Sequence, residues 1–142
     1  MLGDEQRLIE EYVETGKVKL IYWHVLDFGE PSLLAAEAAE CAGEQGRFWE
    51  MNHALFENQA HLWRDTLETI YGLAGQIEGL DQGQFKSCMV ERRYLAKVKA
   101  DDEARRARGI RFRPSFDLDG ERIEGALPYE QMRSRIEVAL AD

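Results

Sequence analysis

Two cysteines are the residues of this chain best suited to redox chemistry. Cys41 and Cys88 lie far apart in the sequence, each within a stretch expected to be helical. Three interpretations are open: buried free thiols, a structural disulfide, or a redox-active pair. A reactive thiol needs an exposed, electropositive setting, whereas Cys41 lies on an alanine-rich packing face. These surroundings argue against the catalytic interpretation.

Histidines and glutamates supply the other groups that could do chemistry. The chain has three histidines, His24, His53 and His61. None of them stands at a zinc-ligand spacing from the cysteines, so we expect no metal site and no cofactor. Glu37, Glu40 and Glu44 share one face of a predicted helix. General acid–base catalysis would need a converging partner, and we expect this acidic face to be solvated.

Pro114 stands at the entrance of a short β-prone run. A proline cannot donate a ladder hydrogen bond, so it belongs at a sheet edge, at the first residue of a strand, or in a cis bond. Both an ordinary trans proline and a cis proline that leaves the preceding backbone able to hold a peptide are open interpretations. Asp119-Gly120 then separates two β-prone runs, which predicts a hairpin with a type I′ turn.

The elements that must position these residues are helices around a few strands. Residues 4–15 have helical periodicity, and residues 17–24 form a β-prone run that predicts a strand. Residues 32–108 predict a block of about five helices, and residues 129–140 predict a final helix that covers the hairpin. Three residues are expected to cap helices in the block: Ser32, Asp65 and Asp81.

Composition limits the class of protein and its partners. A chain of 142 residues, 44% hydrophobic and 32% charged, suits one globular domain. The net charge of −9 argues against nucleic acid as a partner. We expect no membrane span, because no stretch reaches the roughly 18 apolar residues of a transmembrane helix. As written, without a signal peptide, the chain is expected to be cytoplasmic; a missing N-terminal segment would make it an exported protein.

Two blocks of the sequence resemble the DsbA-like branch of the thioredoxin superfamily. Residues 109–129, GIRFRPSFDLDGERIEGALPY, are similar to that family's cis-proline loop, hairpin and final helix, and residues 33–59 resemble its inserted helices. The resemblance covers nearly the whole chain and implies an α/β, thioredoxin-like fold. Its β/α scaffold would be discontinuous, formed by residues 1–31 and 109–142, with residues 32–108 as an inserted helical subdomain.

The first strand of that fold is missing here, together with its redox motif. In the family this strand ends in Cys-x-x-Cys at a helix N-terminus, where the helix dipole stabilises a thiolate. Residues 1–142 contain no Cys-x-x-Cys, so the family's reacting thiols carry over to no residue. In relatives the absent strand lies between the strands at 17–24 and 115–118. Our hypothesis is that the two unpaired edges drive homodimerisation.

The resemblance also implies roles for two sets of residues. Arg113, Pro114 and Ser115 match the family's substrate groove, although the family usually has Thr or Val before the proline. Arg113 suits an acidic peptide or carboxylate ligand, or it is a solvent-facing residue in a site no longer used for exchange. Cys41 and Cys88 resemble positions where some relatives carry a second, non-catalytic disulfide that clamps two helices.

The implied function is thiol-disulfide exchange on protein thiols and disulfides. Lacking its own Cys-x-x-Cys, the chain would be incomplete or inactive alone, and competent only if a longer gene product or a partner supplies the strand and motif. Whether it is an enzyme by itself is therefore left open. The alternatives are a non-catalytic peptide-binding or structural thioredoxin-fold protein, and a cofactorless isomerase or glutathione-handling relative.

Overall fold

The computed structural model describes residues 2–142 and divides them into two units. The scaffold unit joins the N-terminal residues up to Tyr22 with Arg108–Asp142, and the helical unit comprises Trp23–Ala107. Each unit has a hydrophobic core cluster within its own residues. The candidate sites can therefore be considered unit by unit.

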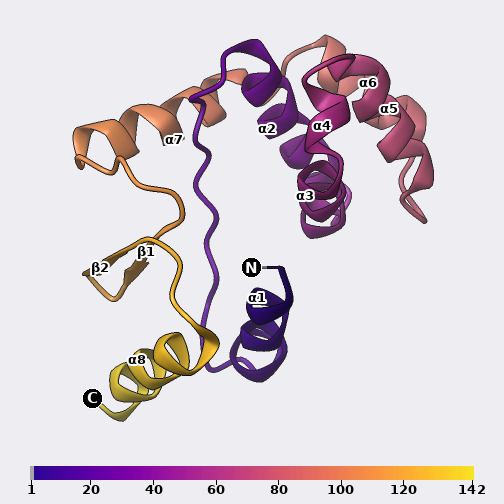
Figure 1. The fold of residues 1–142 in the computed structure, drawn as a ribbon. Coiled ribbons are helices and arrows are strands. Elements are labelled where there is room, and N and C mark those ends of the chain that lie inside the picture. Colours follow the sequence, from indigo (N-terminus) through magenta and orange to yellow (C-terminus); the bar gives the residue numbers. More distant parts are fainter. Residues whose placement is uncertain (1) are drawn as a thin grey trace. The chain divides into compact units, whose positions relative to one another are not determined.

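The helical unit confirms the predicted all-helical block (Figure 1). Its helices are α2 (Glu30–Gly43), α3 (Phe48–Glu57), α4 (Gln59–Leu62), α5 (Thr66–Gln76), α6 (Gln82–Val90) and α7 (Leu95–Ala107). Helix α2 is central, because it packs against α3, α5, α6 and α7. Ala38, Ala39 and Ala42 of this helix are at most 1% exposed, and their small side chains allow the neighbouring helices to approach closely.

The predicted helix caps are correct at one of the three positions. The Asp81 side chain accepts a hydrogen bond from the Gln84 N–H at 2.8 Å and caps α6. Ser32 lies inside the first turn of α2, which begins two residues earlier, and its Oγ accepts from the Phe28 N–H instead. Asp65 precedes α5 but makes no capping hydrogen bond. The capping prediction was therefore wrong for Ser32 and Asp65.

The scaffold unit consists of helices around one hairpin (Figure 1). Helix α1 (Leu2–Leu8) continues as a π-helical turn, η1 (Ile9–Val13), and the chain ends with β1 (Ser115–Leu118), β2 (Glu121–Glu124) and α8 (Tyr129–Ala141). The buried core of this unit joins η1, β2 and α8 through Tyr12, Ile123, Met132 and Ile136. The final helix covers the hairpin as the sequence predicted.

The hairpin has the predicted turn. Strands β1 and β2 pair antiparallel, with Ser115 opposite Glu124 and Leu118 opposite Glu121. The two turn residues both have positive φ, 48° at Asp119 and 92° at Gly120. A type I′ turn requires this conformation, which matches the right-handed twist of the strands.

The strand predicted at residues 17–24 is wrong. This segment forms no strand, and the sheet of the described residues contains β1 and β2 alone. A β-prone run becomes a strand only where a neighbouring strand accepts and donates its ladder hydrogen bonds. Within the described residues no strand pairs with residues 17–24, and Leu20 and Ile21 are exposed.

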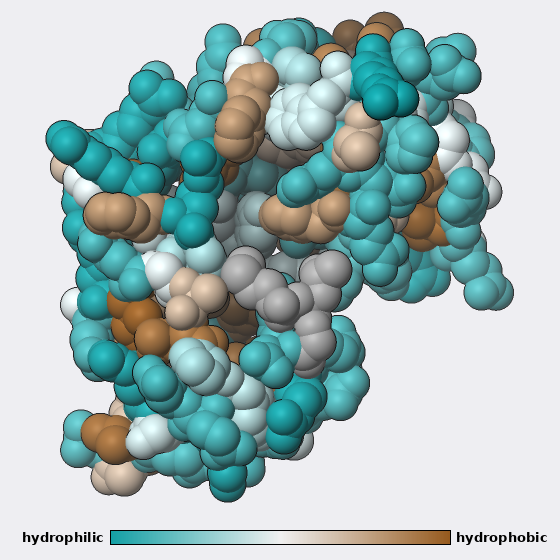
Figure 2. All heavy atoms as spheres, viewed as in Figure 1, coloured by the Kyte–Doolittle hydropathy of each residue, from teal (hydrophilic) through white to brown (hydrophobic). Residues whose placement is uncertain are grey.

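The surface is mainly hydrophilic on the face shown in Figure 2, with hydrophobic residues in scattered patches. Ile21, Val90 and Phe112 are among the exposed large hydrophobic residues. Within residues 2–142, every helix is too short or too polar to cross a bilayer.

Candidate functional site

The predicted groove residues Arg113, Pro114 and Ser115 lie at the entrance of β1. The Arg113–Pro114 peptide bond is cis. The Pro114 carbonyl accepts a hydrogen bond from the Gly125 N–H at 2.8 Å, and the Ser115 Oγ donates to the Phe112 carbonyl at 2.6 Å. These bonds fix the backbone of the loop, while the side chains of Phe112 and Arg113 are exposed to solvent.

One edge of β1 carries backbone groups that face away from β2. In an antiparallel pair, residues that bond to the partner alternate with residues whose N–H and C=O point to the opposite side. Pro114 bonds to the residue beyond β2, so by this alternation Ser115 and Asp117 present their backbone groups to the other edge. No third strand pairs there within the described part of the chain. Such an edge can accept an extended polypeptide by strand addition.

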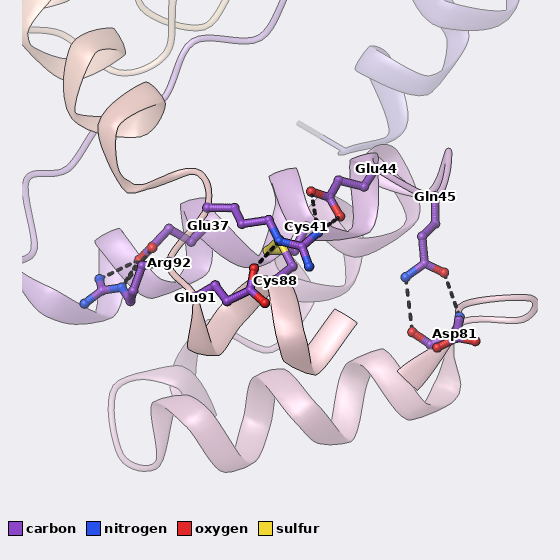
Figure 3. Close-up of a disulfide and its surroundings, with 9 residues drawn as sticks. Glu37, Cys41, Glu44, Gln45, Asp81, Cys88, Glu91 and Arg92 are labelled. Carbon is purple, nitrogen blue, oxygen red and sulfur yellow. Dashed lines mark hydrogen bonds and ion pairs between the residues drawn. A yellow bond between two sulfur atoms is a disulfide. The ribbon is translucent and has the colours of Figure 1, made fainter. Parts of the chain in front are cut away.

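Cys41 and Cys88 form a disulfide between α2 and α6 (Figure 3). Their Cα atoms are 5.8 Å apart, and both residues are buried. Each cysteine lies in the last turn of its helix, where the dipole disfavours a thiolate rather than stabilising it. Of the three interpretations of this pair, the structure supports a structural disulfide.

Helix α6 runs antiparallel to α2, and links at three heights join this pair of segments (Figure 3). The links are Glu37 with Arg92, Cys41 with Cys88, and Gln45 with Asp81. Cys41 lies one helical turn after Glu37 in α2, and Gln45 follows in the turn just beyond the helix end at Gly43. The disulfide is thus the middle link of three, and we call this set the α2–α6 ladder.

The outer links of the ladder differ in burial. Arg92 donates to both carboxylate oxygens of Glu37, at 2.9 Å from Nε and 2.6 Å from Nη2, and Glu37 is only 1% exposed. The hydrogen bonds that Arg92 donates to the Glu37 carboxylate raise the pKa of Arg92 above its ordinary value. At the other end, Gln45 exchanges two hydrogen bonds with the backbone of Asp81 in an exposed setting.

The expectation of a solvated acidic face is wrong for these three glutamates. Glu37 pairs with Arg92, Glu44 accepts from Arg93 at 2.9 Å, and Glu40 accepts from Lys97 at 2.8 Å. The basic partners come from residues 92–97, about a third of the chain away. Helical periodicity reports only local neighbours, so no local signal in the sequence identified these pairs.

His24 joins Glu40 in a small charged cluster of the helical unit. Its Nε2 lies 2.8 Å from the Glu40 carboxylate, and Asp101 brings a third group with potential ligand atoms within 4.8 Å. Lys97 already bonds to both carboxylates. Burial acts to raise the pKa of Glu40, but the bonds from His24 and Lys97 outweigh it and lower that pKa. The ammonium group supplies the positive charge that a metal would bring.

A second charged network holds the segment after His24 against α7. Asp102 accepts from the Leu26 N–H at 3.0 Å, from Arg105 at 2.8 Å and from Arg106 at 2.7 Å, and Arg105 also bonds to Asp27. Burial alone would raise the pKa of Asp102, but these donors hold it below its ordinary value. The network satisfies a buried carboxylate and positions a loop, so we assign it a structural role.

Comparison with known proteins identifies similar sequences. A family model described as Thioredoxin matches residues 4–138. The chain is 32% identical over 108 residues to Na(+)/H(+) antiporter NhaA 1 of Salinispora arenicola, covering 76% of this chain and 16% of that protein. It is 22% identical over 138 residues to Disulfide bond formation protein D of Bacillus subtilis, covering 94% of this chain and 62% of that protein. The chain thus spans less than two thirds of each of these relatives.

Proposed function

Because this chain belongs to the DsbA-like branch of the thioredoxin family, we propose that it is the substrate-holding part of a protein thiol-disulfide oxidoreductase. It would work with a Cys-x-x-Cys that residues 1–142 do not contain. The observation that carries the proposal is the fixed loop at Arg113–Ser115 directly beside the unpaired edge of β1. Main-chain bonds at such an edge hold extended polypeptides with little regard to sequence, as a general disulfide-forming protein requires.

The chain's own disulfide is unsuited to the exchange step. Catalytic thiolates gain stability at helix N-termini and are reached from solvent, whereas Cys41 and Cys88 are buried in the last turns of α2 and α6. The same disulfide supports work in an oxidising compartment, because the cytosol keeps most thiols reduced. We propose such a compartment for this protein.

Refolding of reduced ribonuclease tests this function. In a glutathione buffer, the 142-residue chain alone is expected to leave the rate of ribonuclease reactivation at background. Fusing a β-strand that ends in Cys-x-x-Cys before residue 1 should raise that rate at least about tenfold, because it adds the low-pKa thiolate. The matched control carries Ser-x-x-Ser in the same fusion. Equal rates for the two fusions would contradict the proposal.

A peptide-binding protein without catalysis is the second candidate, and the exposed Arg113 favours it. Arg113 is exposed and directly precedes Pro114 at the entrance of β1, and a guanidinium group suits an acidic polypeptide. If binding is the whole function, the chain binds an acidic unfolded polypeptide without any added motif. Loss of binding in Arg113→Glu, with binding kept in Arg64→Glu, which changes another exposed arginine, would then locate the site.

The unpaired strand edge also leads us to propose a homodimer. Two copies that pair β1 edge to β1 edge would satisfy the outward backbone groups of Ser115 and Asp117 in each copy. Light scattering on the purified chain should give twice the mass of 16.4 kDa. Replacing Asp117 by proline removes an outward N–H, and should shift the mass toward one chain. A wild-type monomer at every concentration would exclude this dimer.

A further inference from the structure

The α2–α6 ladder is asymmetric around its disulfide. On the Cys41 side, α2 is enclosed by α3, α5, α6 and α7. On the Cys88 side, α6 ends at Val90, and residues 91–94 form a turn before α7. A turn of this kind opens at a lower free energy than a central helix. Any motion that uncovers the disulfide should therefore begin beside Cys88.

Arg92 is the residue that holds this turn in place. Its backbone has φ 52°, an angle that residues other than glycine rarely adopt. The three hydrogen bonds to buried Glu37 compensate for this conformation. Arg93 adds a second ion pair, with Glu44. The Arg92 and Arg93 side chains are about equally exposed, at 35% and 36%, but Glu44 is 15% exposed whereas Glu37 is 1% exposed. A more exposed pair contributes less, so the Glu37–Arg92 pair is the main ion-pair restraint on the turn.

From this asymmetry we infer that the Glu37–Arg92 ion pair is a latch, which controls the access of external thiols to the Sγ of Cys88. With the latch closed, both sulfurs are buried and the disulfide resists exchange. When the turn opens, Cys88 reaches solvent first while Cys41 stays enclosed. The pair thus makes this disulfide conditionally reducible. The inference does not depend on the proposed function of the scaffold unit.

The exchange chemistry follows from which sulfur is exposed. A thiolate of an external dithiol attacks the Sγ of Cys88, the disulfide bond breaks, and the electron pair leaves on the Sγ of Cys41, which takes a proton from water. The second thiolate of the dithiol then displaces the Sγ of Cys88. The dithiol ends as a disulfide, and both cysteines end as thiols.

The rate of reduction by dithiothreitol tests the latch. The protein is mixed with the dithiol, quenched with iodoacetamide at intervals, and its free thiols are counted by intact mass. Glu37→Gln is expected to speed reduction at least about tenfold, because the buried carboxylate that holds Arg92 is lost. The matched control, Glu44→Gln, makes the same change seven positions along the sequence and should change the rate by less than about twofold. Equal acceleration in both variants would overturn the inference.

Two further measurements keep the test independent of global unfolding. Arg92→Lys keeps the charge but loses the paired donors, so it should accelerate reduction while urea unfolding stays cooperative; a wild-type rate in this variant would exclude a latch. In wild type, brief treatment with the monothiol 2-mercaptoethanol, acid quenching and peptide mapping should find the adduct on Cys88. An adduct mainly on Cys41, or shared equally, would show that the turn is not the point of entry.

Discussion

The double variant Cys41→Ala/Cys88→Ala unfolds with a free energy about 4 kcal/mol below that of wild type. The disulfide closes a loop between positions 47 apart, and in the chain-entropy model a cross-link of this span removes that much freedom from the unfolded chain. The whole free energy of unfolding of a typical domain is only about 5–15 kcal/mol. Loss of this link would therefore leave the helical unit marginal.

Tryptophan fluorescence during urea unfolding measures this loss in the right unit. All three tryptophans, Trp23, Trp49 and Trp63, lie within Trp23–Ala107, so the signal reports the helical unit. Wild type kept reduced by excess dithiothreitol throughout the urea titration supplies the same uncross-linked reference without a change of side chain. The single variant Cys41→Ala already removes the cross-link but changes only one of the two side chains. It should therefore show nearly the whole loss of unfolding free energy if the cross-link, and not side-chain packing, is the main contribution. A difference below about 1 kcal/mol would mean that the unfolded chain keeps much of its structure.

Local patterns in the sequence predicted those parts of the fold that local physics determines. The Asp119-Gly120 turn needs two residues with positive φ, and both have it. The helices follow from apolar spacing, and Asp81 from a capping bond three residues away. The strand prediction for residues 17–24 was wrong because a strand depends on a neighbouring strand, which the local sequence does not report. Strand propensity describes a surface that suits a sheet, and it does not supply the partner.

The candidate sites also differ in how far the sequence predicted them. Resemblance predicted a substrate groove at Arg113, Pro114 and Ser115. The structure shows Ser115 as the first residue of β1, opposite Glu124, and the groove stays a prediction. The ion pair of Glu37 and Arg92 had no comparable signal, since neither residue type is expected in a core. What could have raised the question is position 37 itself, which lies four residues before Cys41 on a helix of buried alanines. A carboxylate on such a face requires a cation from somewhere in the chain.

Arg92→Ala should cost roughly 1–3 kcal/mol of unfolding free energy, the range for leaving a buried polar group without its partner. The buried Glu37 carboxylate loses the guanidinium that compensates its charge, and the cost stays below the roughly 3–5 kcal/mol of a fully buried pair because the Arg92 side chain is 35% exposed. Urea unfolding followed by tryptophan fluorescence gives the value. A cost below about 1 kcal/mol would show that water reaches Glu37 and that the pair behaves like a surface salt bridge.

Arg92→Gly separates the charge from the backbone in the same measurement. Glycine loses the ion pair equally but adopts φ 52° without the penalty that alanine has there, about 1 kcal/mol. It should therefore destabilise the helical unit by about 1 kcal/mol less than Arg92→Ala. Adding Glu37→Gln to Arg92→Ala removes the uncompensated charge and should recover part of the loss, so the two changes together cost less than their sum. Strict additivity would mean that Glu37 and Arg92 act independently, and their ion pair would then not be what holds the turn.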